Sequence, residues 1–202
     1  MAEHDEAVGD RVERVAAALR SHKIEAIVVE SGEEARWVVL GMIPEGAEVH
    51  SGKSKTLQDL GLYAEIVESG RYDALRPRYF AMDRKTQGRE IRKLVAAPDF
   101  MLGSVAAVTD AGVLVAASAT GSQLGAYSSG AGRLILIVGA QKIVADLEAA
   151  LRRIDEVVFP YENAQVRELL GVDTALENVL LMYGEWNEGR TTVVLVREPV
   201  GV

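Results

Sequence analysis

The feature that most constrains the fold is the alternation of helix-like and strand-like segments over residues 5–70. Between Asp5 and Ser21, apolar residues recur at steps of three and four, the period of one helix face. "KIEAIVVE" is typical of a short buried strand, and Ser31 followed by Glu34 has the spacing of a capping box that opens a second helix. "AEVH" and "YAEIVE" are then predicted as strands on either side of a third helix. This order predicts an α/β fold with an open, mostly parallel sheet flanked by helices.

The rest of the chain is predicted to complete a single domain over 1–202. The segment 71–98 is rich in basic residues and is expected to be a mostly helical insertion. After it, "SVAAVT" and "VLVAAS" are predicted as a tight hairpin that turns at Gly112. A strand at "LILIVG", helices at 141–153 and "ENAQVRELLG", and a late strand at "TTVVLVRE" finish the pattern.

Charge and the lack of cysteine narrow the function classes. The chain has 22 Lys and Arg against 30 Asp and Glu, whereas nucleic acids and anionic membranes are bound by basic surfaces. With no cysteine, it offers no disulfide, thiol nucleophile or thiolate ligand for zinc or an iron–sulfur cluster. The first residues lack the features of a signal peptide, and the apolar runs are too short to span a bilayer. A cytoplasmic protein that binds neither nucleic acid nor membrane is expected.

A basic segment interrupts this acidic sequence. Residues 71–93 carry 8 basic and 3 acidic groups. One interpretation is a solvated helix face with ion pairs between neighbouring turns. The other is that some of these cations point into a cleft and hold an anion, the candidates being Arg76, Arg78, Arg84 and Lys85.

"HSGKSKT" has the ingredients of an anion site without the full phosphate-loop motif. Gly46 lies one residue too far from Gly52 to satisfy the spacing of that motif. A strand nevertheless leads into a short glycine-containing turn that opens a helix, which leaves amide donors free to face a ligand. The alternative is that Ser54 or Thr56 merely caps the helix while Lys53 stays in water.

The stretch "ASATGSQLGAYSSGAG" is nearly free of charge and rich in glycine and serine. Its end, "GAGRLI", does not match the dinucleotide-binding fingerprint, because Ile135 stands where the third glycine should be and the segment precedes its strand instead of following it. Its bare backbone suits close approach to a ligand, whereas the alternative is a mobile surface loop. Because strands of one continuing sheet are predicted on both sides, a linker between domains is the poorer interpretation.

Candidates for catalysis are few. No Gly-x-Ser-x-Gly nucleophile motif occurs, and the three histidines show no metal-ligand spacing, so no metal site is expected. His4 and His22 are expected in solvent. His50, at the end of a predicted strand, is a candidate acid or base, and Asp110 is a candidate carboxylate that also suits an ordinary turn.

Three segments together resemble the LUD domain, the lactate-utilisation family, in its single-domain form: "SGKSKTLQDLGL", "PDFMLGSVAAVTDAGVLVAASATGSQLG" and "GAGRLILIVGAQKIVADLEAALRRI". The resemblance implies a fold like that of ribose-5-phosphate isomerases, glucosamine-6-phosphate deaminases and CoA transferases. Carried over by position, it implies one ligand pocket formed by three loops and the segment after "LILIVG": Ser51, Gly52, Lys53, Ser54, Thr56, Asp110, Gly112, Thr120, Gly121, Ser122, Gln123, Gln141 and Lys142.

The resemblance also implies a role in bacterial oxidation of L-lactate to pyruvate, beside partner proteins that carry iron–sulfur clusters. Without cysteine, this chain is expected to be a component that binds no cluster or other cofactor. It would bind a small anionic metabolite or a partner subunit. Two alternatives stay open: an isomerase or acyl/CoA transferase acting on a phosphorylated or CoA-linked substrate, and a purely structural partner. Trp37, in a helix that is apolar nearly all round, favours a homodimer.

Overall fold

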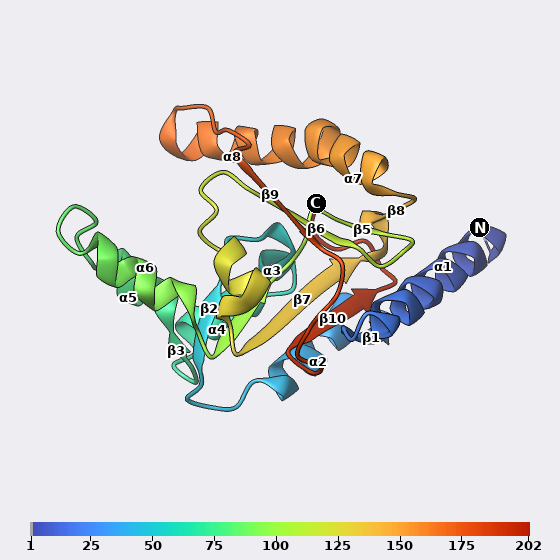
Figure 1. The fold of residues 1–202 in the computed structure, drawn as a ribbon, viewed down its shortest axis with the longest axis horizontal. Helices are drawn as coiled ribbons and strands as arrows, with labels where there is room; N and C mark the ends of the chain where they lie inside the picture. The colour runs from blue at the N-terminus through green and yellow to red at the C-terminus, as the bar shows by residue number, and fades with distance from the viewer. Residues whose placement is uncertain (1) are drawn as a thin grey trace.

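The computed structural model describes the backbone of residues 2–202 and the side chains from Asp10 onward, so His4 lies outside the described side chains. Its main feature is a parallel sheet of six strands in the order β1-β10-β7-β4-β2-β3 (Figure 1). The strands are β1 (Glu25–Val29), β2 (Glu48–Ser51), β3 (Asp73–Ala74), β4 (Phe100–Gly103), β7 (Arg133–Gly139) and β10 (Thr191–Val196). The predicted α/β class with an open parallel sheet is confirmed.

A second, smaller sheet has the order β8-β5-β6-β9. It consists of β5 (Ala107–Thr109), β6 (Leu114–Ser118), β8 (Ile143–Val144) and β9 (Asn178–Met182). The predicted hairpin is β5 and β6, which pair antiparallel, and Gly112 takes the left-handed φ of 79° that its turn needs.

The large sheet is buried on both faces, which explains the continuous apolar sequence of β7. Leu134 and Leu136 pack with α1 (Ala2–Ser21) and with the second sheet. Ile135 and Ile137 point the other way, into the core that α2 (Gly32–Met42), α3 (Lys55–Asp59) and α4 (Leu62–Glu68) cover. Two apolar cores therefore fix the sheet between its helices.

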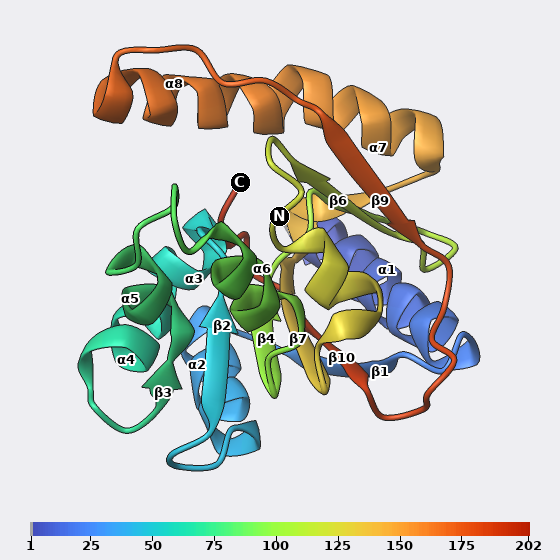
Figure 2. The same cartoon turned by 60° about the vertical axis from the view of Figure 1, so that its left-hand side comes forward.

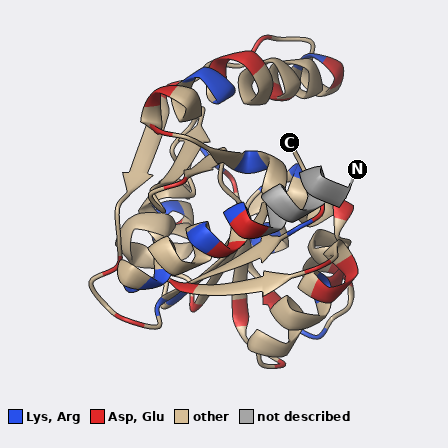
Figure 3. Cartoon of the chain, turned by 90° about the vertical axis from the view of Figure 1, so that its right-hand side faces the viewer, with Lys and Arg blue, Asp and Glu red and all other residues tan. Residues whose placement is uncertain are grey.

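The remaining helices form two pairs, one beside β2 and β3 and one over the second sheet. They are α5 (Leu75–Phe80), α6 (Gly88–Ala96), α7 (Leu147–Arg153) and α8 (Phe159–Leu170), with single turns at Ala126–Gly130, Ala140–Lys142 and Ile154–Val158. Figure 2 shows α7 and α8 running as one arm above the rest of the chain, and basic and acidic positions both occur along it (Figure 3). Over residues 2–202, no helix combines the length and hydrophobicity needed to cross a bilayer.

Local signals placed several element ends correctly. Ser31 caps α2, its side chain accepting a hydrogen bond from the Glu34 amide. The carboxylate of Glu34 in turn accepts from the Glu30 amide at 2.9 Å. Gly61, with φ 62°, separates α3 from the next element.

That next element corrects the sequence analysis: "YAEIVE" is part of helix α4, and the strand of this region, β3, comes later and has only two residues. The physical reason is that Leu62 and Ile66, four residues apart, are both fully buried in the same core. In a strand, Ala64 would lie on the same face as these two side chains, yet Ala64 is exposed.

The surroundings of the glycine-rich loop were also mispredicted. The strands on its two sides, β6 and β7, belong to different sheets, and β4 and β9 were not foreseen. The helix expected from 141 begins only at Leu147, because residues 143–144 pair with β5 and Asp146 caps the helix through the Ala149 amide.

Candidate functional site

A cleft of about 790 Å³ opens where the carboxyl ends of β2, β4 and β7 meet the second sheet. Parallel strands bring their carboxyl ends to one edge, and ligands of open α/β sheets bind there. The segments 52–56, 104–106 and 116–120 line it, together with residues of α5, α6 and α8. The sequence analysis predicted that the loop after the "AEVH" strand and the glycine-rich loop form one pocket. The structure brings segments 52–56 and 116–120 to the same cleft.

Lys142 lies at the floor of the cleft and is only 2% exposed. Its Nζ donates to Thr56 Oγ1 at 2.9 Å, Ser104 Oγ at 3.0 Å and the Val105 carbonyl at 3.3 Å. Burial, followed by the nearby charge of Arg153, lowers the pKa of Lys142 to about 7, and Asp59 opposes the shift. The floor therefore holds an amine that exchanges between charged and neutral forms near neutral pH.

The loop after β2 supplies one side of the floor. Gly52, Lys53, Ser54 and Thr56 all line the cleft, and Lys53 pairs with Glu162 of α8 at 3.2 Å. Ser54 is the residue before α3, yet its side chain makes no capping hydrogen bond. Ser51 is fully buried behind the loop and is not part of the lining.

The first half of the glycine-rich loop forms the opposite wall. Thr120, Ser122 and Gln123 line the cleft, and the Gln123 amide oxygen accepts from Ser118 Oγ at 3.1 Å. Gly121 takes a left-handed φ of 69°, and its amide donates to the same Ser118 hydroxyl at 3.0 Å. The wall is thus a hydroxyl-rich turn tied to the end of β6.

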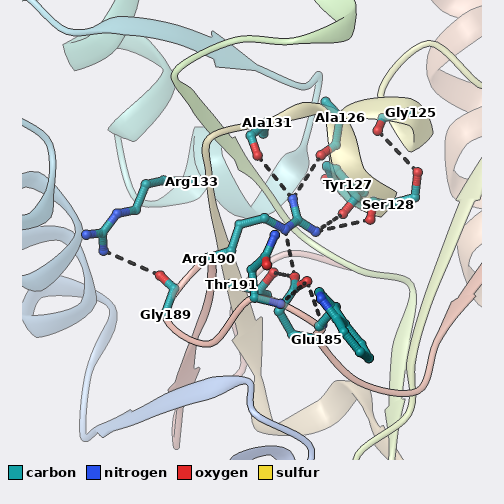
Figure 4. Close-up of polar contacts among 12 residues, drawn as sticks. Gly125, Ala126, Tyr127, Ser128, Ala131, Arg133, Glu185, Gly189, Arg190 and Thr191 are labelled. Atoms are coloured by element: carbon teal, nitrogen blue, oxygen red, sulfur yellow. Dashed lines mark hydrogen bonds and ion pairs between the residues drawn. The ribbon is translucent and has the colours of Figure 1, made fainter.

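Arg190 fixes the second half of the loop (Figure 4). Its guanidinium donates to the carbonyls of Tyr127 at 2.7 Å and Ala131 at 3.3 Å, and it pairs with Glu185 at 2.8 Å. The Tyr127 hydroxyl donates to the Ser104 carbonyl at 3.0 Å, and burial raises the pKa of this phenol. The loop is therefore held by buried polar contacts, which disfavours the interpretation as a mobile loop.

The basic segment divides between the cleft and the outer surface. Arg76 and Arg84 line the cleft beside Phe80. Arg78 points elsewhere and pairs with Asp73 at 2.7 Å, and Lys85 is exposed in the turn between α5 and α6. Arg76 and Arg84 thus face the cleft, while Arg78 and Lys85 lie on the solvated surface, and whether the first two bind an anion stays a prediction.

His50 lines the same side of the cleft and packs edge-on against Tyr79, with ring centroids 5.6 Å apart. It is 4% exposed. Burial, and then the charge of Arg76, lowers the pKa of His50 to about 4, against a backbone hydrogen bond at Val95. Its imidazole is therefore neutral at pH 7 and a weak base.

Helix α8, the second helix of the arm, covers one side of the cleft. Tyr161, Glu162 and Val166 line the cleft together with Leu169 and Leu170. The last two side chains are also strongly exposed to solvent, at 72% and 66%. The cleft therefore combines a polar floor with an apolar roof.

Besides Ser51 and Gly121, which lie behind the lining residues, three more predicted pocket residues are not part of the cleft. Asp110 forms an ion pair with Arg11 of α1, at 2.7 Å. Gly112 packs against the backbone of α1, where an added Cβ would lie 3.1 Å from Ala18. Gln141 donates to the Val200 carbonyl at 2.8 Å and so holds the C-terminal segment. The hairpin turn faces α1 because β5 and β6 leave the cleft in that direction, which removes Asp110 from the candidate site.

The family model for the LUD domain matches residues 12–196. This chain belongs to the LUD-domain family. Among solved structures, a DUF162 family protein from Deinococcus radiodurans is similar to it over 94% of this chain and 97% of that one, with 12% identity and a TM-score of 0.52. At this identity the likeness supports the fold alone. A comparison with curated proteins gave no match.

Sequence reasoning missed several residues of this LUD domain's cleft. Ser104 and Tyr127 were overlooked, as was the whole contribution of α8. The signal for Ser104 in the sequence was its place directly after Gly103. The structure gives the reason for that glycine: a Cβ added to Gly103 would lie 1.9 Å from the Tyr127 hydroxyl oxygen. No signal pointed to α8, whose approach to the cleft depends on the course of the arm. Among the described residues, no group of three or more His, Asp or Glu is arranged to hold a metal ion.

Proposed function

We propose that this LUD domain binds a small organic anion in the cleft, with Lys142 as the main cation of the floor. The observation that carries the proposal is the environment of that lysine. It is almost fully buried at the cleft lining, and it forms no ion pair with any carboxylate among residues 10–202. A buried ammonium without a carboxylate partner is costly unless a ligand supplies the negative charge.

Family membership supports a more specific role. We propose that the chain is a cytoplasmic component of bacterial L-lactate oxidation, or of a related organic-acid oxidation, beside partner proteins that carry iron–sulfur clusters. The sequence has no cysteine, so the thiolates that hold such clusters would come from the partners.

Calorimetric titration with L-lactate and pyruvate tests the anion site. A bound ligand at a hundredfold excess over its dissociation constant raises the free energy of unfolding by about 2.7 kcal/mol, so thermal shifts provide a parallel readout. Lys142→Met is expected to weaken binding at least about tenfold, because it removes the positive charge at the floor of the cleft. Lys93→Met, an exposed position outside the cleft lining, is the matched control. If both variants bind as the parent does, Lys142 is not the anion site.

A second candidate function is an isomerase or acyl/CoA transferase acting on a phosphorylated or CoA-linked substrate. Two observations favour it: the volume of about 790 Å³ exceeds the needs of a three-carbon acid, and a lysine with a pKa of about 7 suits general-base chemistry. Stabilisation by sugar phosphates or CoA esters, but not by lactate or pyruvate, would favour this function. Capture of cluster-containing proteins from the same organism would favour the first.

A further inference from the structure

Two arginines of the cleft share one aromatic ring. The guanidinium carbons of Arg76 and Arg84 lie 5.1 Å and 5.7 Å from the centroid of the Phe80 ring. Phe80 itself is 57% exposed and stacks on Tyr79, with centroids 5.1 Å apart. The ring therefore gathers two positive charges around one side chain at the rim of the cleft.

Neither guanidinium is neutralised by the protein. Among residues 10–202, Arg76 and Arg84 form no ion pair. Arg76 meets only neutral groups, with a long contact of 3.5 Å to the Ser51 carbonyl and a place beside the Tyr79 phenol. The carboxylates nearby are already occupied. Asp83 accepts from the Lys85 amide and the Thr86 hydroxyl, Glu162 pairs with Lys53, and Asp73 pairs with Arg78. Both positive charges therefore lack a counter-charge from the protein, which an anionic ligand can supply.

The charge and geometry of the pair indicate which anion. A carboxylate has two oxygens, and a single guanidinium satisfies both of them in a bidentate pair. A phosphoryl group carries nearly two negative charges and three acceptor oxygens, which suits two guanidinium groups. Lys142 occupies a different part of the same cleft, on the floor with Thr56 and Ser104. The cleft thus offers two separate cationic positions.

We propose that Arg76 and Arg84 form a phosphoryl-binding subsite, and that the ligand of this cleft is two-ended, with its phosphoryl group at this pair and its carboxylate or carbonyl group at Lys142. The inference rests on the proposed function to the extent that the cleft binds an organic anion. It adds the chemical class of that anion. The same phosphoryl group occurs on short acids and at the end of longer chains such as phosphopantetheine.

Two matched ligand pairs test the subsite and separate these sources. We would titrate the full chain with glycerate and 3-phosphoglycerate, and with pantetheine and 4′-phosphopantetheine, each pair differing only in the phosphoryl group. In the parent, the phosphorylated member of at least one pair is expected to bind about tenfold more tightly or better, the effect of a charge-assisted contact. Arg76→Gln and Arg84→Gln are each expected to reduce this ratio to within about twofold.

Arg78→Gln is the matched control, because Arg78 lies on the same helix but pairs with Asp73 and Glu48. It is expected to leave the ratio unchanged. A competition experiment needs only the parent: inorganic phosphate is expected to displace the phosphorylated ligand. Equal binding of both members of each pair, or a ratio that survives both glutamine variants, would overturn the subsite while leaving the anion site at Lys142 standing. Failure of every one of these ligands, and of lactate and pyruvate, to bind the parent would overturn both.

Discussion

All three N–H donors of the Lys142 ammonium are taken by oxygens of two strand-end segments, the loop after β2 and the segment after β4. None of these oxygens carries a charge, so the contacts hold the side chain in place without neutralising it. This explains why burial dominates the shift of its pKa to about 7. The residue therefore lowers the stability of the empty protein at neutral pH and favours an anionic ligand.

The pKa of Lys142 gives a pH prediction. Between the folded value of about 7 and the ordinary value of 10.5, the unfolded chain binds the proton and the folded chain does not. The contribution of Lys142 to stability therefore rises with pH across this window and is lost as pH falls toward 7. The free energy of unfolding of the parent, measured by urea denaturation relative to Lys142→Met, is expected to grow by at most about 1.4 kcal/mol per pH unit. A constant difference from pH 7 to pH 10 would contradict the assigned shift.

The sequence predicted pocket residues correctly where their position depends only on neighbouring residues in the chain. Thr56, Ser122 and Gln123 follow glycine-containing turns at the ends of predicted strands, and they line the cleft as expected. Asp110 was a candidate that also suited an ordinary turn, and it pairs with Arg11, which is 99 residues away in the chain. No local pattern reports a partner at that distance.

At the scale of elements, the glycine-rich loop is shaped by close packing. An added Cβ on Gly130 would lie 1.8 Å from the Ala96 carbonyl oxygen at the end of α6, whereas Gly125 has no heavy atom within 4 Å of that position. The loop thus touches α6 through a glycine and the β4 segment through Tyr127. Its place in the wall of the cleft follows from these contacts.

The different surroundings of Gly130 and Gly125 predict different changes in the free energy of unfolding when each is replaced by alanine. Gly130→Ala is expected to lower the free energy of unfolding by about 1–3 kcal/mol, because the methyl group must displace backbone. Gly125→Ala, at a φ of −62°, is expected to be neutral or to stabilise by up to about 1 kcal/mol through the unfolded chain. Urea denaturation of both variants provides the comparison, and equal effects would show that the loop is not packed as described.

At the scale of the whole molecule, the expected homodimer remains a prediction. Helix α2 buries Ala35 and Val39 against the sheet while leaving Trp37 70% exposed. A large apolar side chain exposed in this way is a candidate interface residue.

Sedimentation equilibrium tests the dimer. The parent is expected at twice the chain mass of 21.8 kDa, and Trp37→Glu is expected at the mass of one chain, because a buried charge would oppose association. Trp186→Glu changes the other tryptophan, which is 89% exposed and has Lys23 over its ring, and it should leave the parent mass unchanged. A parent at the mass of one chain would refute the prediction.

The sequence by itself determined the fold class, the caps at Ser31 and Gly61, and the short polar turns that follow β2 and β6. These features depend on periodicity and on backbone preferences within a few residues, which a single sequence displays. The tertiary structure alone decided that the hairpin forms a second sheet, that α8 covers the cleft, and that Lys142 lies buried among hydroxyl groups. Those outcomes depend on contacts between residues far apart in the chain, and because strand pairing and burial are settled across the whole core, no local pattern specifies them.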